Sequence, residues 1–230
     1  MLTQPGVYPV QLSVSDGKDT TFADVVHVSV GIKPVITVTS PAQNNTLFRA
    51  GDTLTFAATA TVGAALAWSI VLFHDNHVHP VVTGAAGGTY QLQVPTQGHP
   101  FHDDTYYVAT CKATSPAGLV SQVVMVAKPQ EVMFTLKTEP PGIGINVDGI
   151  STRTPVALDS MIGFVHHVQA LETLCVDGAQ YTFQQWSTQA TSTTLDITVP
   201  DTDLQLTAHY TSGAACNQVR KKMNMKMKRK

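Results

Sequence analysis

Residues 66–80 read Leu-Ala-Trp-Ser-Ile-Val-Leu-Phe-His-Asp-Asn-His-Val-His-Pro. Trp68, Ile70 and Leu72 occur at every second position, and an extended strand places such residues on one face. A run with one apolar face is typical of a half-buried strand in a β-sheet. The stretch therefore predicts a strand over residues 67–73 with Trp68 in a protein core, followed by a segment rich in histidine.

Similar patterns surround this strand on both sides. Gly- and Pro-containing turns separate them, and charged residues make up only 13% of the chain. Short strands divided by such turns are typical of an immunoglobulin-like (Ig-like) β-sandwich. We therefore expect a complete sandwich over residues 34–128, with further strands at residues 35–39, 53–60, 90–94, 106–113 and 119–126.

Residues 1–31 contain two alternating runs, 7–14 and 23–30, around the turn sequence Ser-Asp-Gly-Lys-Asp at 15–19. This pattern predicts a β-hairpin. The segment PGVYPVQLSVSDGKDTTFADVVHVSV resembles the last two strands of a PKD domain, an Ig-like module of exported proteins. The resemblance implies a partial PKD-like hairpin at the N-terminus, in a chain that is a fragment of a longer protein.

Residues 130–212 predict a second, small all-β domain. Its segments PGIGINVDG, YTFQQWS and LTAHY resemble the PEGA-like repeat that follows Ig modules in exported proteins. Within it, Trp186 and Tyr181 either belong to the core or form a platform on which a sugar stacks. Residues 213–230 are expected to be a disordered basic tail. The predicted fold class is all-β, with tandem Ig-like β-sandwich domains.

Histidines are concentrated in the segment that follows the strand predicted over residues 67–73. His74, His77 and His79 follow an H-x-x-H-x-H pattern, and His99 and His102 form a second H-x-x-H pair. A strand places His77 and His79 on one face because they lie two positions apart. Imidazole and carboxylate groups together suit a transition metal better than calcium. We therefore expect these five histidines to bind a transition metal ion, with zinc as the first candidate and copper as an alternative.

Such a metal can serve two purposes. Four histidine ligands make a structural site, whereas three leave a position for a water whose pKa zinc lowers to about 7. In the second case Asp103 or Asp104 acts as a base or orients a ligand imidazole, and Tyr106 or Tyr107 donates to a developing oxyanion. The chain is then a metal-dependent hydrolase for ester, phosphoester or glycosidic bonds, with a carbohydrate or small ester as substrate. A carbohydrate-binding or adhesion module without catalysis is the third alternative.

The sequence around the histidines resembles a known module. FRAGDTLTFAATA, LAWSIVLFHDNHVHP and TQGHPFHDDTYYVATCKATSPAGLVS are similar to the Ig-like module after the β-propeller of secreted PQQ-type glucose/sorbosone dehydrogenases. That family carries H-[ND]-x-H-x-H-P and a later T-x-G-H, which fall here on His74, His77, His79 and His99. The resemblance covers residues 34–128 and implies a metal-binding module that accompanies a sugar-active enzyme. Dehydrogenase activity is not implied, because this chain lacks the propeller.

The charge distribution and the cysteines limit the classes of partner and the cell compartments that we expect for this chain. Residues 220–230 hold seven of the fourteen Lys and Arg residues, which leaves seven basic side chains against sixteen acidic ones elsewhere. That balance argues against nucleic-acid binding, and no apolar run is long enough to span a membrane. Cys111 is expected to be a buried small residue, whereas Cys175 and Cys216 either pair or stay free. The low charge and many Thr, Val and Gly residues favour an extracellular or periplasmic protein without its leader.

Overall fold

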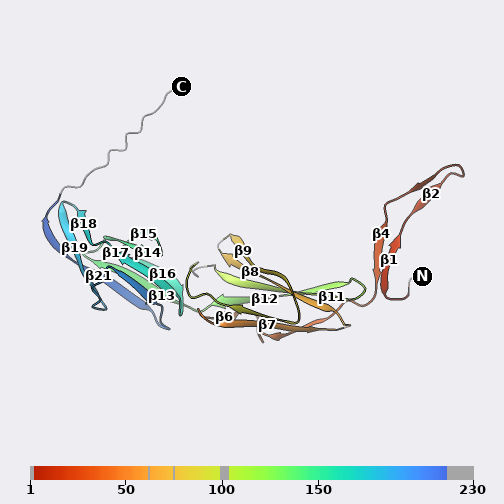
Figure 1. Cartoon of the computed structure of the whole chain (residues 1–230), viewed down its shortest axis with the longest axis horizontal. Coiled ribbons are helices and arrows are strands. Elements are labelled where there is room, and N and C mark those ends of the chain that lie inside the picture. Colours follow the sequence, from red (N-terminus) through yellow and green to blue (C-terminus); the bar gives the residue numbers. More distant parts are fainter. Residues whose placement is uncertain (1–2, 62, 75, 99–103, 217–230) are drawn as a thin grey trace, which may run out of the picture. The chain divides into compact units, whose positions relative to one another are not determined.

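The computed structural model describes residues 3–61, 63–74, 76–98 and 104–216. These residues form strands, turns and loops, so the all-β fold class is confirmed (Figure 1). None of them belongs to a helix that is long and apolar enough to cross a membrane. They divide into two compact units, which are described separately: the first holds residues 3–95 and 104–130, and the second holds residues 96–98 and 131–216.

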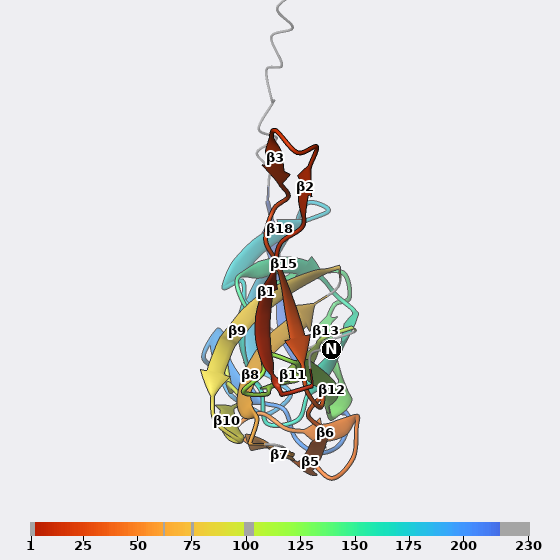
Figure 2. The same cartoon turned by 90° about the vertical axis from the view of Figure 1, so that its right-hand side faces the viewer.

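A two-stranded ribbon begins the first unit. Strand β1 (Gly6–Val10) pairs antiparallel with β4 (Val26–Val30), and β2 (Ser13–Ser15) pairs antiparallel with β3 (Thr20–Phe22). Figure 2 shows β2 and β3 at the end of the ribbon that β1 starts. The predicted hairpin is therefore present, but it is interrupted around Leu12. Nearly all of its side chains are at least partly open to solvent, so it contributes little to a core.

The rest of the first unit is a β-sandwich. One sheet has the order β10–β7–β5 and the other β6–β12–β11–β8–β9. The described strands pair antiparallel, except that β6 pairs parallel with β12. Their bounds are β5 (Ile36–Ser40), β6 (Thr46–Phe48), β7 (Thr53–Ala60), β8 (Ala65–His74), β9 (His77–Ala86), β10 (Thr89–Gln93), β11 (Tyr106–Thr114) and β12 (Val120–Pro129).

Trp68 lies between the two sheets of this sandwich. It is 0% exposed, and its ring centroid lies 5.8 Å from that of Phe56 on the facing sheet. The Trp68 indole N–H donates to the carbonyl of Gly88, at 3.3 Å, so the polar atom of this buried ring is satisfied. Cys111 pairs with Trp68 across β8 and β11 and is also 0% exposed. Both residues therefore occupy the core positions expected from the sequence.

The second unit is also a β-sandwich. Its sheets have the orders β16–β13–β21–β19–β18 and β15–β14–β17–β20. The last strand, which contains the segment LTAHY, continues to Ala215. The bounds are β13 (Glu131–Glu139), β14 (Gly144–Val147), β15 (Ile150–Arg153), β16 (Val156–Met161), β17 (Val165–Ala170), β18 (Thr173–Val176), β19 (Ala179–Trp186), β20 (Thr194–Thr198) and β21 (Leu204–Ala215).

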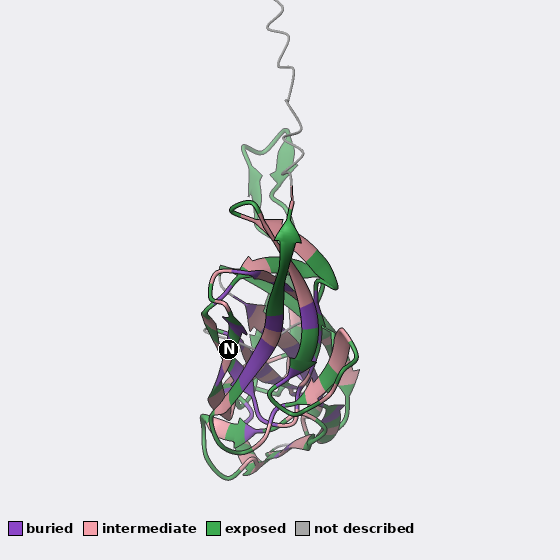
Figure 3. Ribbon diagram, turned by 90° about the vertical axis from the view of Figure 1, so that its left-hand side faces the viewer, coloured by how far each residue is buried: buried purple, intermediate pink, exposed green. Residues whose placement is uncertain are grey.

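Apolar side chains from both sheets fill the centre of the second unit. Figure 3 shows buried residues alternating with exposed ones along these strands. Trp186 is 0% exposed, and its indole N–H donates to the Ser192 carbonyl at 2.8 Å. Tyr181 is partly buried against the same core. A sugar platform centred on Trp186 is therefore wrong, because the faces of that ring are covered by the protein interior.

Cys175 and Cys216 form a disulfide. The bond connects β18 to the residue after β21, and β19 lies between these two strands in the sheet. The backbone N–H of Cys216 also donates to the Gly178 carbonyl, at 2.9 Å. The disulfide therefore fixes the C-terminal end of β21 to the edge of its own sheet.

Candidate functional site

The β8–β9 hairpin brings three of the predicted histidine ligands together. His74 ends β8 and pairs with His77 at the start of β9, and His79 pairs with Leu72. Leu72 and His74 belong to the row of β8 residues that faces the core. Because directly paired residues project from the same face, all three imidazoles lie on the inner face of this sheet. β9 is the edge strand there, which leaves His77 and His79 exposed.

The rings of these histidines are close enough to act on one ligand. The Nε2 atoms of His77 and His79 lie 3.0 Å apart, and the two ring centroids are 4.7 Å apart. The rings of His74 and His77 meet edge to face with centroids 5.3 Å apart. We call His74, His77 and His79 the histidine cluster.

A hydroxyl group orients the buried member of the histidine cluster. His74 Nδ1 lies 2.8 Å from the Thr105 side-chain oxygen, and both residues are buried. When Nδ1–H donates to that oxygen, the lone pair of the ring is on Nε2, as in a metal-ligating histidine held by an outer partner. Thr105 lies three positions after His102, the last residue of the second histidine motif. The contact therefore connects the buried histidine at the end of β8 to the residue that precedes β11.

The distance between the histidine nitrogens suits a metal ion, but the described residues do not form a complete metal site. Two imidazole nitrogens on a tetrahedral zinc, each at about 2.0–2.1 Å from it, lie about 3.3 Å apart. The His77 and His79 nitrogens, at 3.0 Å, need only a small adjustment to reach that spacing. Within the described residues, however, no group of three or more His, Cys, Asp or Glu side chains is arranged to hold a metal ion. His99, His102 and Asp103 lie outside the described residues.

The predicted catalytic residues are not all near the cluster. Tyr106 pairs with Phe73, on the opposite face from Leu72 and the histidines, and stacks on the Phe73 ring at 4.8 Å. Tyr107 is on the inner face but is 3% exposed, and burial raises the pKa of its hydroxyl to about 12. Asp104 is exposed, and no contact between its carboxylate and the cluster is observed among the described residues. The structure therefore separates Tyr106 from the histidines.

A second polar group of residues lies in the other unit, where sequence reasoning did not place a site. His166 Nδ1 lies 2.6 Å from the Asp148 carboxylate, and His166 Nε2 lies 2.6 Å from the Ser160 hydroxyl oxygen. These contacts follow the order of a serine–histidine–aspartate triad. Three separate segments supply them: the β14–β15 turn, the end of β16 and β17. No spacing in the sequence could have revealed this arrangement.

The residues of this triad-like network are too deeply buried to act on a substrate. Ser160 is 1% exposed and His166 is 3% exposed, and the His166 ring lies between those of Phe134 and Phe164. A substrate cannot reach the Ser160 oxygen in this arrangement, and a catalytic nucleophile requires such access. The network instead satisfies the hydrogen bonds of polar groups in the interior.

Asp148 connects this network to the surface. Burial alone would raise its pKa, but hydrogen bonds from His166 and from the His167 backbone N–H outweigh that effect and hold the pKa below the usual range. The adjacent His167 points to the opposite, exposed face, where its Nδ1 lies 2.8 Å from the Asp196 carboxylate. Asp148, His167 and Asp196 contribute to a shallow hollow of about 350 Å³.

Comparisons with known proteins give no family for this chain. No protein-family model and no curated protein matches it. Among solved structures, the major pilin subunit BcpA of Bacillus cereus aligns with a TM-score of 0.38 and 11% identity, covering 90% of this chain and 78% of the pilin. The fibronectin(III)-like modules of Clostridium thermocellum CbhA align with a TM-score of 0.25 and 13% identity, covering 74% of this chain and 95% of theirs. Similarity at this level supports no conclusion about function.

Proposed function

We propose that the chain is a metal-binding β-sandwich module, and that the histidine cluster contributes ligands for a transition metal ion, zinc in the first place. The observation that carries this proposal is the 3.0 Å separation of the His77 and His79 Nε2 atoms. Without a metal, two imidazole nitrogens at this distance form a hydrogen bond in which one Nε2–H donates to the other Nε2. When a cation binds, the donor ring carries its proton on Nδ1 instead, and both Nε2 lone pairs are then available to the cation.

The surroundings of the cluster favour a site that binds a cation in the folded state. His74 is held by Thr105, and all three imidazoles project from one face of two paired strands. Ligands held on paired strands lose less conformational entropy on binding than ligands on an unpaired loop, which increases affinity. The sequence nominates His99 and His102 as the remaining ligands, and substitution of each tests that assignment.

A non-catalytic metal fits the described residues better than a hydrolytic centre does. Tyr106, one of the two predicted oxyanion donors, lies on the other face of the sheet from the histidines. The Tyr106 phenol therefore does not face a water bound at His77 and His79. On this proposal the metal cross-links the tip of the β8–β9 hairpin, and copper remains an alternative to zinc.

We also propose that the chain acts outside the cytoplasm, as a companion of a sugar-active enzyme. The Cys175–Cys216 disulfide supports the location, because such bonds form and persist mainly in oxidising compartments. The association with a sugar-active enzyme is supported by the H-D-N-H-V-H-P motif alone, which resembles that of the modules in sugar dehydrogenases.

Isothermal titration of the metal-free chain with zinc tests the proposal. We expect one ion per chain, and His77→Ala and His79→Ala should each weaken binding about tenfold or more, a loss of about 1.4 kcal/mol. His99→Ala and His102→Ala measure the contribution of the second motif. His167→Ala and His209→Ala are matched controls, because both are surface histidines of the second unit. Unchanged zinc affinity in both the His77 and His79 variants would overturn the proposal.

A further inference from the structure

A polar groove lies on one side of the second sandwich, away from the histidine cluster in the sequence. It has a volume of about 530 Å³ and is lined by residues of the β14–β15 hairpin and of β18. β15 ends one sheet and β18 ends the other, so both strands that border the groove are edge strands. Among the described strands, the groove therefore lies between the last strand of one sheet and the last strand of the other.

The register of the β14–β15 hairpin shows which backbone groups face the groove. Asp148 and Gly149 both have positive φ and form a two-residue turn, so Val147 and Ile150 exchange backbone hydrogen bonds across it. Hydrogen-bonded and non-hydrogen-bonded pairs alternate in an antiparallel ladder. Ser151 and Arg153 therefore belong to non-hydrogen-bonded pairs, and their N–H and C=O groups point away from β14 to the open edge.

The facing hairpin is built in the same way. Asp177 and Gly178 form its two-residue turn with positive φ, and Val176 pairs with Ala179. By the same alternation, the backbone N–H and C=O groups of Cys175 point away from β19. No other described strand pairs with β15 or with β18 on these sides. An extended chain in the groove thus meets the outward backbone donors and acceptors of Ser151 and Arg153 on β15.

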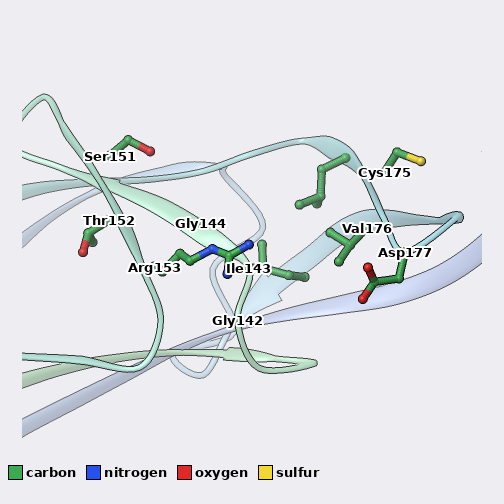
Figure 4. A pocket seen from close by; sticks show the side chains of 10 residues that line it. Gly142, Ile143, Gly144, Ser151, Thr152, Arg153, Cys175, Val176 and Asp177 are labelled. Carbon is green, nitrogen blue, oxygen red and sulfur yellow. The ribbon is translucent and has the colours of Figure 1, made fainter. Parts of the chain in front are cut away.

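Two charged side chains mark the groove. Figure 4 shows the Arg153 side chain extending across the strand past Gly144 toward Ile143, and Asp177 on the far wall beside Val176. Among the described residues, neither the Arg153 guanidinium nor the Asp177 carboxylate makes an ion pair or a side-chain hydrogen bond. Glycine at position 144 leaves room above the neighbouring strand, where the guanidinium can receive a carboxylate.

We propose that this groove binds an extended peptide segment, which adds a strand to the β15 edge and places an acidic side chain on Arg153. Strand addition uses the free N–H and C=O groups of Ser151 and Arg153 for affinity, and side-chain contacts supply specificity. A basic residue nearer the other end of the peptide is matched by Asp177. The exposed side chain of Ile150, at 70%, offers an apolar surface for the added strand to cover.

The lining distinguishes a peptide from a sugar. The residues around the groove include no aromatic side chain, whereas sugar sites commonly use an aromatic face. The free groups are instead those of an unpaired strand edge together with separate charges of both signs. This inference does not depend on metal binding by the histidine cluster.

Selection from a displayed library of random heptapeptides, with the intact disulfide-bonded chain as the target, tests the proposal. We expect enriched peptides that combine β-formers with a recurrent Asp or Glu, and that bind with 1:1 stoichiometry as synthetic peptides. Arg153→Gln should weaken this binding about tenfold, as should Glu→Gln or Asp→Asn in the peptide. Ser151→Pro should do the same, because proline removes the outward N–H and is tolerated on an edge strand.

Lys137→Gln is the matched control for the loss of positive charge, since Lys137 lies on β13 and does not line the groove. Hydrogen exchange should show slower exchange at Ser151 and Arg153 when the peptide is bound. N-methylation of every second peptide amide should abolish binding when the methylated amides are those that face β15, and not when they are the ones that face away. The proposal is overturned by a failure to enrich any peptide, by equal binding to the Ser151→Pro chain, or by occupation of the groove by a second copy of the chain instead.

Discussion

The carboxylate of Asp148 lies 2.6 Å from Nδ1 of His166 and also accepts the backbone N–H of His167 at 2.8 Å. Asp148 is a turn residue with positive φ, so the turn that closes β14 and β15 also delivers a charged group to a buried histidine. Local turn conformation and the polar interior of the second unit are thereby coupled through one side chain.

Asp148→Asn should make the second unit less stable and less sensitive to acid. Asparagine keeps the turn, because it tolerates positive φ, but it removes the charged acceptor, at a cost of about 1–3 kcal/mol. The folded-state pKa of Asp148 is lowered from 3.8, so its stabilisation is present above pH 3.8 and is lost as the pH falls from that value through the folded pKa. Urea-dependent hydrogen exchange of residues 131–216 measures both effects.

Comparison of the Asp148→Asn variant with wild type separates the contribution of the Asp148 carboxylate to stability from those of the other acidic residues. The stability difference between the two proteins should be largest near neutral pH and should shrink below pH 3.8. Asp159→Asn serves as control, because Asp159 is an exposed residue of β16. A difference that stays constant down to pH 2 would exclude the assigned role of the Asp148 charge.

Ser160→Ala should destabilise the second unit by about 1–3 kcal/mol, because it leaves the buried Nε2 of His166 without its partner. The double variant Ser160→Ala/His166→Phe should recover part of that loss, since an apolar ring can pack against Phe134 and Phe164. Chemical denaturation of the three proteins gives the values. A double variant less stable than Ser160→Ala alone would contradict this interpretation of the network.

Loss of the disulfide should loosen the C-terminal edge of the second unit. Cys175 and Cys216 are 41 residues apart, and closing a loop of that length stabilises a fold by up to about 4 kcal/mol. Cys216→Ser should lower the unfolding free energy by about 2–4 kcal/mol and speed amide exchange in β18 and at the end of β21. Cys111→Ser is not a neutral control, since that thiol is buried, so reduction of the wild-type protein provides the comparison.

Amides of the N-terminal ribbon should exchange much faster than those of β8 and β11. Leu12, Val14 and Phe22 are each more than 60% exposed, and an isolated two-stranded ribbon is only marginally stable in water. Hydrogen exchange followed by mass spectrometry can compare the segments in one experiment. Equal protection in the ribbon and in β8 would show that something covers the ribbon in solution.

Period-two patterns in the sequence predicted the all-β fold and the core role of Trp68. The same periodicity placed His77 and His79 on one face, because that inference needs only local strand geometry. It could not tell which of Tyr106 and Tyr107 faces the histidines, since that depends on the cross-strand register with β8. The contacts among Asp148, His166 and Ser160 were also missed, because they join segments that are distant in the sequence and leave no local pattern.

The short edge strands were also missed from sequence. β15 and β18 have four residues each, which is too short for a clear alternation. The available signal was an Asp-Gly dipeptide beside each strand. Asp148-Gly149 comes directly before β15, and Asp177-Gly178 comes directly after β18. Read as two-residue turns, these dipeptides indicate hairpins, and hence the edges that border the proposed peptide groove.

Nitrogen chemical shifts of the histidine rings test the central claim most directly. In long-range proton–nitrogen spectra of ¹⁵N-labelled chain, the proposed site predicts that one equivalent of zinc moves the Nε2 resonances of His77 and His79 together to metal-bound positions, while those of His167 and His209 stay unchanged. Nε2 signals of His77 and His79 that do not respond to zinc, or that respond no more than the surface histidines do, would contradict metal binding at the cluster.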